Sequence, residues 1–393
     1  MTAAQIYSFI NEVQQDALGA NAIRVKDTSS LVSLGDIVLS SQTNTEQFYQ
    51  KLADRIGQTI IKGLVYVAPS RRYMLMDPMT FGVVLQKVQV RHMAGATENG
   101  AWPNASSNAK NPFDQTQDTT DIIASLYSSY TTWAADTKTI YDYQLSSAFT
   151  DAAKMGAFVD LIFTDMNNAL EYQIEQVCKL ARATAIATCL EGTNANVKRN
   201  LLSEYNTAKG GTAISVTAAL MDTNFLKFAS RQILLATKRM QNMTRLFNNA
   251  TADKFTKPEN LVVEVLADFS TATDAYLEAD TYHNELVRLP AYHEIDSWQA
   301  IGTDYGFGST SKVNIITEDA KKAVEGTNDD PEAVEQAGII AFIRDKDKVG
   351  CTVDKVRTKS MYNPAAESTN YFKKADIGFY SDKAEQGVVF YIA

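Results

Sequence analysis

The longest regular pattern of apolar residues lies between residues 151 and 189. The apolar side chains recur every three or four positions without a proline, which is the spacing of one helical face: Phe158, Ile162, Met166, Ala169, Ile174, Val177, Leu180 and Ala181. We predict one continuous helix from about Ala157 to Cys189, roughly 50 Å long. We expect Gly192 to form a left-handed turn that ends it. So long a rod suits a flat, extended subunit.

Two runs with a period of two predict long strands between Met74 and about Tyr143. The first contains Val83, Leu85, Val88 and Val90, and the second contains Ile123, Leu126, Tyr130 and Trp133. The segment between them, residues 93–121, is rich in Gly, Ala, Asn, Ser and Thr and poor in large aliphatic residues. A long loop of this composition cannot form its own core and is typical of functional segments. We therefore predict a projecting hairpin.

An amphipathic pattern also marks residues 46–61, where Phe48, Leu52, Ile56 and Ile60 are spaced four apart. This spacing predicts a helix with one apolar stripe. Two interpretations remain open. The helix covers the core of its own chain, which is the commoner case, or it belongs to an arm that packs on a neighbouring subunit.

The second half of the chain is interpreted as a separate α/β unit followed by strands. A helical stripe runs from about Asn224 to Phe247, with Asp222 or Thr223 as its N-cap. Apolar runs predict strands within 260–269, 338–345, 355–362 and 387–393. Residues 318–336 are charged and poor in apolar side chains, which predicts an exposed loop. The predicted fold class is α+β.

Length and charge narrow the classes of function. The chain has 393 residues, of which 45% are hydrophobic and 21% are charged, as expected for a folded protein of two or more units. Its net charge of −9 disfavours a DNA-reading role. An acidic protein can nevertheless enclose DNA without gripping it, because it repels phosphate and leaves the polymer mobile.

Localisation signals are absent from the sequence. Cys178, Cys189 and Cys351 are too few for a disulfide framework and indicate a reducing compartment. The N-terminus has no cationic start followed by an apolar run, so we predict no signal peptide. No stretch approaches the roughly 20 apolar residues of a membrane-spanning helix. Because the chain begins with Met1, we expect that no long N-terminal segment is removed.

Candidate chemistry is sparse, and we predict no catalytic residue, no metal site, no cofactor and no enzymatic activity. The only histidines are His92, His283 and His293, and the spacing of the last two matches no zinc motif. The glycine-rich segment 302–312 lacks the Gly-Lys-Ser/Thr order of a phosphate loop, so we interpret it as a turn. An enzyme of unknown type remains an alternative that rests on residues 281–312 alone.

Several segments resemble the major capsid proteins of small tailed, podovirus-like bacteriophages. Residues 143–187 resemble the spine-helix region of that family, and residues 201–210, 279–315 and 361–382 resemble its later segments. The resemblance implies a Hong Kong 97-type fold. It implies an N-terminal arm (1–70), an extended loop with its strands (71–140), a peripheral domain with the spine helix (141–205), an axial domain (206–330) and returning strands of both domains (331–393).

The same resemblance implies a structural subunit of the virion capsid, assembled in the host bacterial cytoplasm. Such subunits form hexamers and pentamers of an icosahedral shell that encloses double-stranded DNA, held by loose, non-specific contact. Scaffold and portal proteins are further expected partners, and a membrane is not. The candidates for contacts between subunits are the large apolar residues Trp102, Phe113, Phe48 and Leu52. A subunit of another self-assembling shell, such as an encapsulating compartment or a surface layer, is the alternative.

Overall fold

The computed structural model describes residues 3–19, 22–41, 43–48, 51, 67–76, 85–92, 121–127, 130–134, 137–141, 152–280, 289–299, 304–325 and 329–393. The chain forms two compact units. Unit 1 comprises residues 1–81, 130–178 and 351–378, and unit 2 comprises residues 82–129, 179–350 and 379–393. Both contain helices and sheet, which confirms the predicted α+β class.

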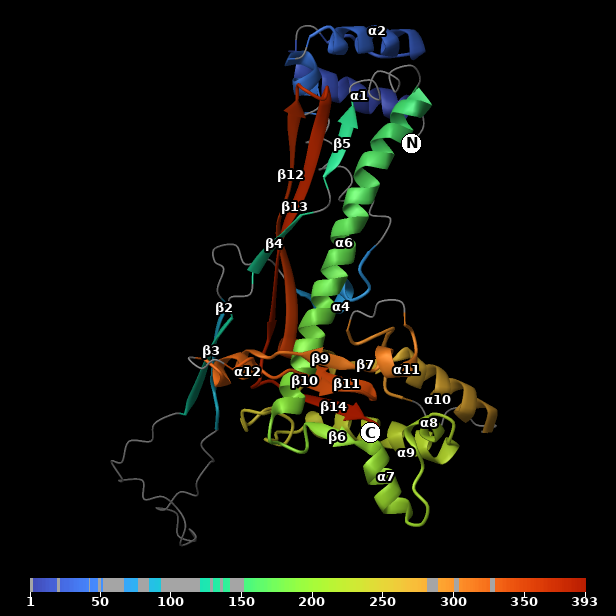
Figure 1. Ribbon diagram of the computed structural model, residues 1–393, viewed down its shortest axis with the longest axis vertical. Coiled ribbons are helices and arrows are strands. Elements are labelled where there is room, and N and C mark those ends of the chain that lie inside the picture. The colour runs from blue at the N-terminus through green and yellow to red at the C-terminus, as the bar shows by residue number, and fades with distance from the viewer. Residues whose placement is uncertain are drawn as a thin grey trace, which may run out of the picture. The chain divides into compact units, whose positions relative to one another are not determined.

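The long helix is confirmed as α6 (Ala152–Glu191), which is continuous over 40 residues (Figure 1). The prediction for its C-terminal end is wrong, because Gly192 does not adopt a left-handed conformation. Instead, Gly192 leaves room for the side chain of Asn249, which a Cβ atom would strike. Asn249 Nδ2 donates to the carbonyl oxygen of Thr188 at 2.6 Å, so a distant side chain satisfies the end of the helix.

The sheet of unit 1 is built on two long strands, β12 (Val349–Asn363) and β13 (Ser368–Ser381). The strand order is β1-β12-β13-β4, and β5 also pairs with β13. The flanking strands are β1 (Leu75–Met76), which is parallel to β12, and β4 (Tyr130–Ala134) and β5 (Lys138–Tyr141), which are antiparallel to β13. The strand predicted within 355–362 is therefore confirmed as part of β12.

Ser70 and Arg71, at the start of α4 (Arg71–Met74), bind carboxylates of α6 within unit 1. Ser70 precedes α4 and donates through its backbone N–H and its hydroxyl to Glu175, at 3.0 and 2.8 Å. Arg71 pairs with Glu171, one helical turn away on α6. These carboxylates are buried, so each needs such a partner.

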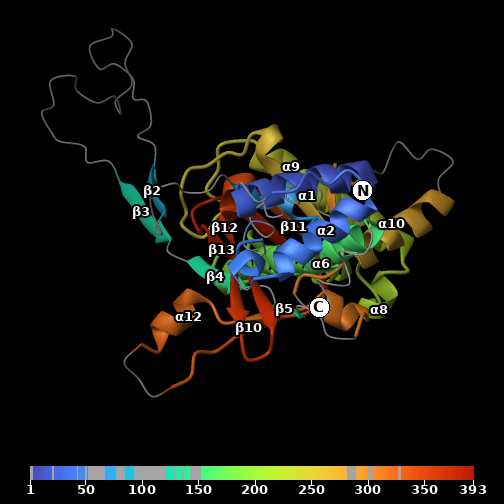
Figure 2. The ribbon, with the colours of Figure 1, turned by 90° about the horizontal axis from the view of Figure 1, so that it is seen from above.

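The first helices of unit 1 are α1 (Ala3–Leu18) and α2 (Thr28–Leu39), which lie side by side (Figures 1 and 2). Asp27 and Ser30 form a capping box at the start of α2. Of the helix predicted over 46–61, residues 43–48 and 51 are described and helical. The side chain of Phe48 is fully buried within the chain, which favours the interpretation that this helix covers its own core.

Unit 2 contains a five-stranded sheet in the order β6-β14-β11-β7-β8. Its strands are β6 (Lys198–Asn200), β7 (Leu261–Leu266), β8 (His293–Ile295), β11 (Ile339–Asp345) and β14 (Gly387–Tyr391). The central strand β11 is antiparallel to β14 and to β7, and all of its residues are buried. The strands predicted within 338–345 and 387–393 are confirmed.

Helices of unit 2 pack on this sheet around a continuous apolar core. They are α7 (Leu201–Lys209), α8 (Val216–Ala219), α9 (Thr223–Met240) and α10 (Ala267–Asp280). The N-cap of α9 is Asp222, whose Oδ1 accepts from the N–H of Phe225 at 2.8 Å, as predicted. The helix ends at Met240, earlier than expected. The strand predicted within 260–269 ends at Leu266, because the next residues begin α10.

The shorter elements of unit 2 correct one prediction. Residues 318–336 contain α12 (Glu318–Ala323) and β10 (Val334–Gln336), which pairs with β9 (Val313–Ile315), so the segment is not a plain loop. A Thr317 N-cap and an acidic first turn stabilise α12 without an apolar stripe. The remaining short elements are α11 (Phe307–Thr310) and the 3₁₀ helices Pro258–Asn260 and Lys346–Lys348. Within the described ranges, no helix combines the length and the apolar character that a membrane span requires.

Substitution of Gly338 tests its close contact with Ile392 beside the five-stranded sheet of unit 2. Gly338 has a φ of +77°, and a Cβ atom there would strike the carbonyl group of Ile392. Gly211 has a similar φ of +75° but open space around it. Each change to alanine should cost about 1–2 kcal/mol for the left-handed backbone, and Gly338→Ala should cost a further ~1–3 kcal/mol for the overlap. Urea unfolding of the two variants measures the difference, and equal losses would contradict the role of Ile392.

Candidate functional site

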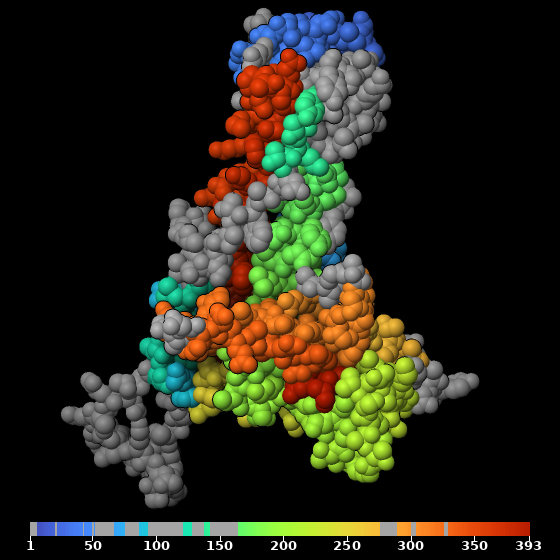
Figure 3. All heavy atoms as spheres, viewed as in Figure 1, coloured from blue at the N-terminus to red at the C-terminus, as the bar shows by residue number. Residues whose placement is uncertain are grey.

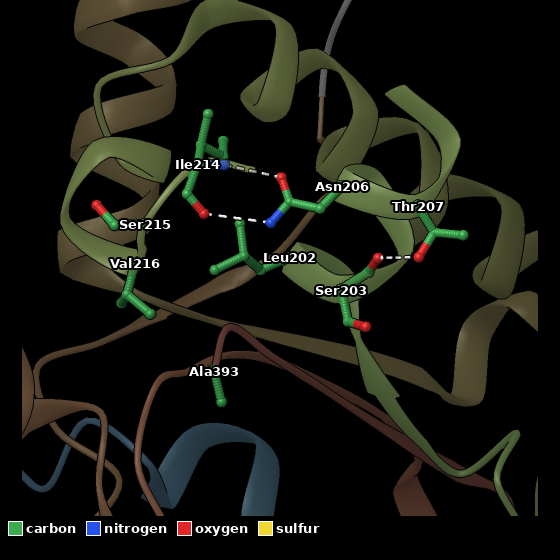
Figure 4. A pocket seen from close by; sticks show the side chains of 8 residues that line it. All are labelled: Leu202, Ser203, Asn206, Thr207, Ile214, Ser215, Val216 and Ala393. Atoms are coloured by element: carbon green, nitrogen blue, oxygen red, sulfur yellow. Dashed lines mark hydrogen bonds between the residues drawn. The ribbon is translucent and has the colours of Figure 1, made fainter. Parts of the chain in front are cut away.

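A hollow in unit 2 is the first candidate for a binding site. The hollow of about 670 Å³ in unit 2 is lined by aliphatic, hydroxyl and amide side chains from α7 and the segment before α8, and by the C-terminal Ala393 (Figure 4). Asn206 closes one wall by bonding both the N–H and the carbonyl of Ile214, at 3.0 and 3.2 Å. Among the residues that the structure describes, no histidine, cysteine, aspartate, glutamate or lysine side chain lines this hollow.

The residues considered for enzymatic chemistry lie apart or outside the described chain. His92 faces Asp253 with 3.7 Å between Nδ1 and Oδ2, His293 lies on β8, and His283 is outside the described residues. Across the part of the chain that the structure describes, no three His, Cys, Asp or Glu side chains gather as a metal site. In the glycine-rich segment, Asp304 accepts from the N–H of Gly306 at 2.9 Å, so a carboxylate occupies the turn where a phosphate would sit.

The feature that stands out is a hairpin in unit 2. Strands β2 (Leu85–Val90) and β3 (Ile122–Tyr127) are antiparallel, with Leu85 opposite Tyr127 and Val90 opposite Ile122. Strands are confirmed in both runs that the sequence predicted, but the second run contains two strands in different sheets, β3 and β4, and not one long strand. The segment between them, which contains Trp102 and Phe113, lies outside the described residues, as does Leu52.

One face of this hairpin is apolar and uncovered. The residues that alternate onto it are all exposed: Gln86, Val88, Val90, Ile122, Ala124 and Leu126. Val88 is 59% exposed and Leu126 is 67% exposed. A two-stranded hairpin is marginally stable by itself, so its other face needs an anchor.

Lys87 supplies that anchor from the opposite face. Its Nζ lies 2.8 Å from Asp382 Oδ2 and 2.6 Å from Glu385 Oε1, and Lys254 Nζ lies 3.0 Å from the same Glu385 oxygen. Burial by itself would lower the pKa of Lys87, but the Asp382 and Glu385 charges outweigh burial and raise that pKa. Burial would likewise raise the pKa of Asp382, and the charge of Lys87 lowers it overall. Lys87 and Asp382 therefore each favour the ionised form of the other.

The segment that contains Asp382 and Glu385 is itself held in place by the buried Lys348. Lys348 Nζ donates to the carbonyl oxygens of Asp382 and Glu385, at 3.0 and 2.9 Å. A Cβ atom on Gly387 would lie 2.7 Å from the Lys348 side chain, so a glycine is needed there. The ring of Tyr127 on β3 packs on Tyr380, with 5.3 Å between centroids. Burial, with the charge of Asp347 next, raises the pKa of Tyr380 to about 12.

The other end of the hairpin is held by the loop after α9. The N–H of Asp253 donates to the carbonyl oxygen of Arg91 at 2.8 Å, and the N–H of Arg91 donates to that of Asp121, also at 2.8 Å. Arg245 binds the carboxylate of Asp253 with two hydrogen bonds of 2.5 and 2.9 Å. The hairpin is therefore attached to unit 2 at both ends, while its apolar face stays open.

A buried ionic cluster connects α6, β7 and β11 in unit 2. Glu264 on β7 accepts from Nε of Arg182 on α6 at 3.0 Å and from Nε of Arg344 on β11 at 3.2 Å. All three side chains are at most 1% exposed. Burial would raise the pKa of Glu264, but the charges of Arg344 and Arg182 outweigh it, so the pKa is lowered. The cluster fixes the C-terminal part of α6 on the sheet.

Sequence reasoning found the strands of the hairpin but missed its anchor. The proposed contact residues Trp102, Phe113 and Leu52 are outside the described residues, and their role stays a prediction. Phe48 is buried, and its part in a subunit contact also stays a prediction. The available signal for the anchor was Lys87 between the apolar positions of β2, but its partner Glu385 is 298 residues away.

Comparison with known proteins identifies the fold. The sequence matches the family of Phi29-like phage major capsid proteins over residues 10–391. A chain from the capsid structure of Staphylococcus phage Andhra is 11% identical with a TM-score of 0.54, and the match covers 84% of this chain and 85% of that chain. A chain from the structure of the head fiber and inner core protein gp22 of native bacteriophage P68 is 10% identical with a TM-score of 0.53, covering 84% and 86%. No curated protein sequence matches this chain.

The buried cluster predicts a defined pH dependence. Glu264→Gln removes the charge that both buried arginines bind and should cost about 3–5 kcal/mol near pH 7. Because the folded pKa of Glu264 is lowered, its stabilisation is present above the unfolded pKa of about 4.3 and is lost as the pH falls through the folded value. Urea unfolding between pH 7 and 3 should therefore show the gap between wild type and variant narrowing below about pH 4.3.

A matched control uses an exposed glutamate. The side chain of Glu259 is 75% exposed and lies 3.9 Å from Lys257. Glu259→Gln should change the free energy of unfolding by less than about 0.5 kcal/mol at any of these pH values. A gap for Glu264→Gln that stays constant with pH would show that folding does not lower the pKa of Glu264, and would contradict its pairing with the two arginines.

The hairpin anchor predicts a local effect. Lys87→Met keeps the apolar stem but leaves Asp382 and Glu385 without this cation, so the hairpin should open more often. Hydrogen exchange of residues 85–90 and 122–127 should accelerate by about 10–100-fold, since a charged hydrogen bond contributes ~1.5–3 kcal/mol. Exchange in β11 should not change, and Lys87→Arg should restore most of the protection. Equal exchange in wild type and Lys87→Met would exclude the anchoring role.

Proposed function

Because the chain belongs to the family of Phi29-like phage major capsid proteins, we propose that its copies associate through the exposed apolar face of the β2–β3 hairpin. The chain is a shell-forming structural subunit with the Hong Kong 97-type fold, and its place is the virion capsid. The assembly is a homo-oligomer of many copies. The hairpin face is the observation that carries the proposal of how these copies meet.

The chemistry of the face supports contact with a second copy. Val88, Val90, Ile122 and Leu126 are between 45% and 67% exposed on a flat two-stranded sheet. Exposed apolar surface of this kind marks interaction sites or aggregation hazards. In a shell made of one chain, the surface that covers it belongs to another copy. The anchor formed by Lys87, Asp382 and Glu385 lowers the entropic cost of this contact, because the hairpin is ordered before it binds.

The finer features of the assembly follow from this contact and the family. A hairpin that binds a different surface of its neighbour makes a head-to-tail contact, which forms a ring where the rotation between neighbours closes. We propose hexameric and pentameric rings of an icosahedral shell. The shell encloses double-stranded DNA by loose, non-specific contact and is assembled in the host bacterial cytoplasm. Scaffold and portal proteins are proposed as further partners.

We also propose that the subunit has no enzymatic role and needs no cofactor. The reason is its family, whose members are structural proteins of the capsid. An encapsulating compartment with protein cargo is the second candidate from the sequence, and the match to a phage capsid family does not favour it. DNA inside isolated particles would exclude that candidate.

Two serine substitutions on the hairpin face test the contact. Ile122→Ser with Leu126→Ser removes apolar surface without adding charge, and should leave the monomer folded while abolishing shells in electron micrographs and sedimentation. Burying these two side chains contributes about 1.5–3 kcal/mol each, so the association constant should fall by roughly 100-fold or more at each contact. The control is Gln86→Ser, which changes the residue opposite Leu126 on the same face. If the double variant forms shells like wild type, the hairpin face is not a subunit contact.

A further inference from the structure

The β12–β13 ribbon of unit 1 carries a row of cations on one face. Lys355, Arg357 and Lys359 alternate along β12, and all three are exposed. Lys374 on β13 is also exposed, and a hollow of about 360 Å³ brings it together with Arg357 and Lys359 around the half-buried ring of Phe372. Red atoms of β12 and β13 lie at the surface in Figure 3.

The opposite face of β13 is covered. Tyr371, Ala375 and Ile377 alternate with the exposed positions of β13 and are buried. Lys373 is buried as well; burial lowers its pKa, and the nearby carboxylate of Glu171 on α6 acts in the other direction. The two faces of β13 therefore differ, and the open face is the one that carries Lys374 beside the cations of β12.

Among the described residues, one of these four cations has a counter-charge. Asp376 accepts two hydrogen bonds from Arg357 at 2.7 and 2.8 Å. No ion-pair partner is found for Lys355, Lys359 or Lys374 among the residues that the structure describes. Four cations facing one carboxylate contrast with the net charge of −9 of the whole chain. Like charges held together repel each other, and a bound polyanion relieves that repulsion.

We propose that this face binds the backbone phosphates of double-stranded DNA. The proposal rests on the proposed enclosure of DNA by the shell. Alternate residues of a strand are about 6.7 Å apart, so Lys355, Arg357 and Lys359 form a regular row of positive charge along β12. Such a row suits a polymer that carries one negative charge on every phosphate. Lysine contacts to phosphate carry no sequence information, so binding is non-specific and weakens as salt rises.

The salt dependence of DNA binding gives a quantitative test. The full-length unassembled chain is titrated with a labelled 30-base-pair duplex at several salt concentrations, starting at low ionic strength. The variant Lys355→Gln/Lys359→Gln/Lys374→Gln leaves the Arg357–Asp376 pair intact. Each phosphate contact adds about 0.9 to the slope of log K against log salt, so the slope should fall by roughly 2–3. Circular dichroism of each protein checks that it is folded.

A matched control separates a localised site from a general charge effect. Arg231, Lys238 and Arg239 are exposed on α9, and changing all three to Gln alters the net charge of the chain equally. This control should keep the slope of wild type. Equal losses in both variants would show that binding follows net charge and would overturn the proposal, as would an unchanged slope in the lysine variant.

Sedimentation of the same samples under assembly conditions distinguishes this proposal from the proposed function. Failure of the wild-type chain to form shells counts against the assembly role whatever its slope with DNA. Loss of shells in the lysine variant with unchanged DNA binding would assign the face to an acidic surface of another copy, and would overturn its assignment to DNA. We expect the lysine variant to form shells like the wild-type chain and to show a reduced slope of log K against log salt.

Discussion

A buried carboxylate, Glu264, connects three elements of unit 2, and the hairpin depends on the arrangement that it fixes. Glu264 accepts from Arg182 of α6 and from Arg344 of β11, in surroundings from which water is excluded. A buried ion pair adds little net stability compared with apolar packing, but breaking it leaves a charge that cannot be solvated. The main effect of the cluster is therefore to fix the positions of α6, β7 and β11 relative to one another, and its net contribution to the free energy of unfolding is small. A shift of α6 by one turn would separate Arg182 from Glu264, so the helix is held in one register on the sheet.

A continuous set of bonds leads from this cluster to the exposed hairpin. Beyond Arg344, the N–H of Asp345 donates to the carbonyl oxygen of Gln386, and Lys348 holds the carbonyls of Asp382 and Glu385. The carboxylates of those two residues then hold Lys87 on β2. Side chains along this path are buried or half-buried, so water competes weakly for their bonds. A hairpin that would be marginal by itself thus presents its apolar face in a defined position.

The sequence predicted the elements with strong periodicity and missed the contacts between distant segments. The helix α6 and the strands β11 and β14 were found because their apolar residues repeat with the helical or the strand period over many positions. The segment with α12 and β10 was missed because it is short and charged, and caps and strand pairing rather than an apolar stripe hold it. The glycine after α6 was expected to end the helix by its own conformation, whereas Asn249 does so from 61 residues away. No local pattern reports a partner at such a separation, and the same holds for Lys87 and Glu385.

Charge sets the conditions under which copies of this subunit can associate. Each copy has a net charge of −9, so two copies repel each other at long range. That repulsion is screened beyond about 10 Å at 0.1 M salt, whereas the contact of apolar side chains acts at short range and does not weaken with salt. An apolar hairpin face is therefore a suitable contact for an acidic subunit, since salt lowers the barrier to approach without weakening the contact. Salt has the opposite effect on the cationic face of the β12–β13 ribbon, because screening weakens the attraction between this face and phosphate. Moderate salt should thus favour contacts between subunits over contacts with DNA, which keeps an enclosed polymer mobile inside a stable shell.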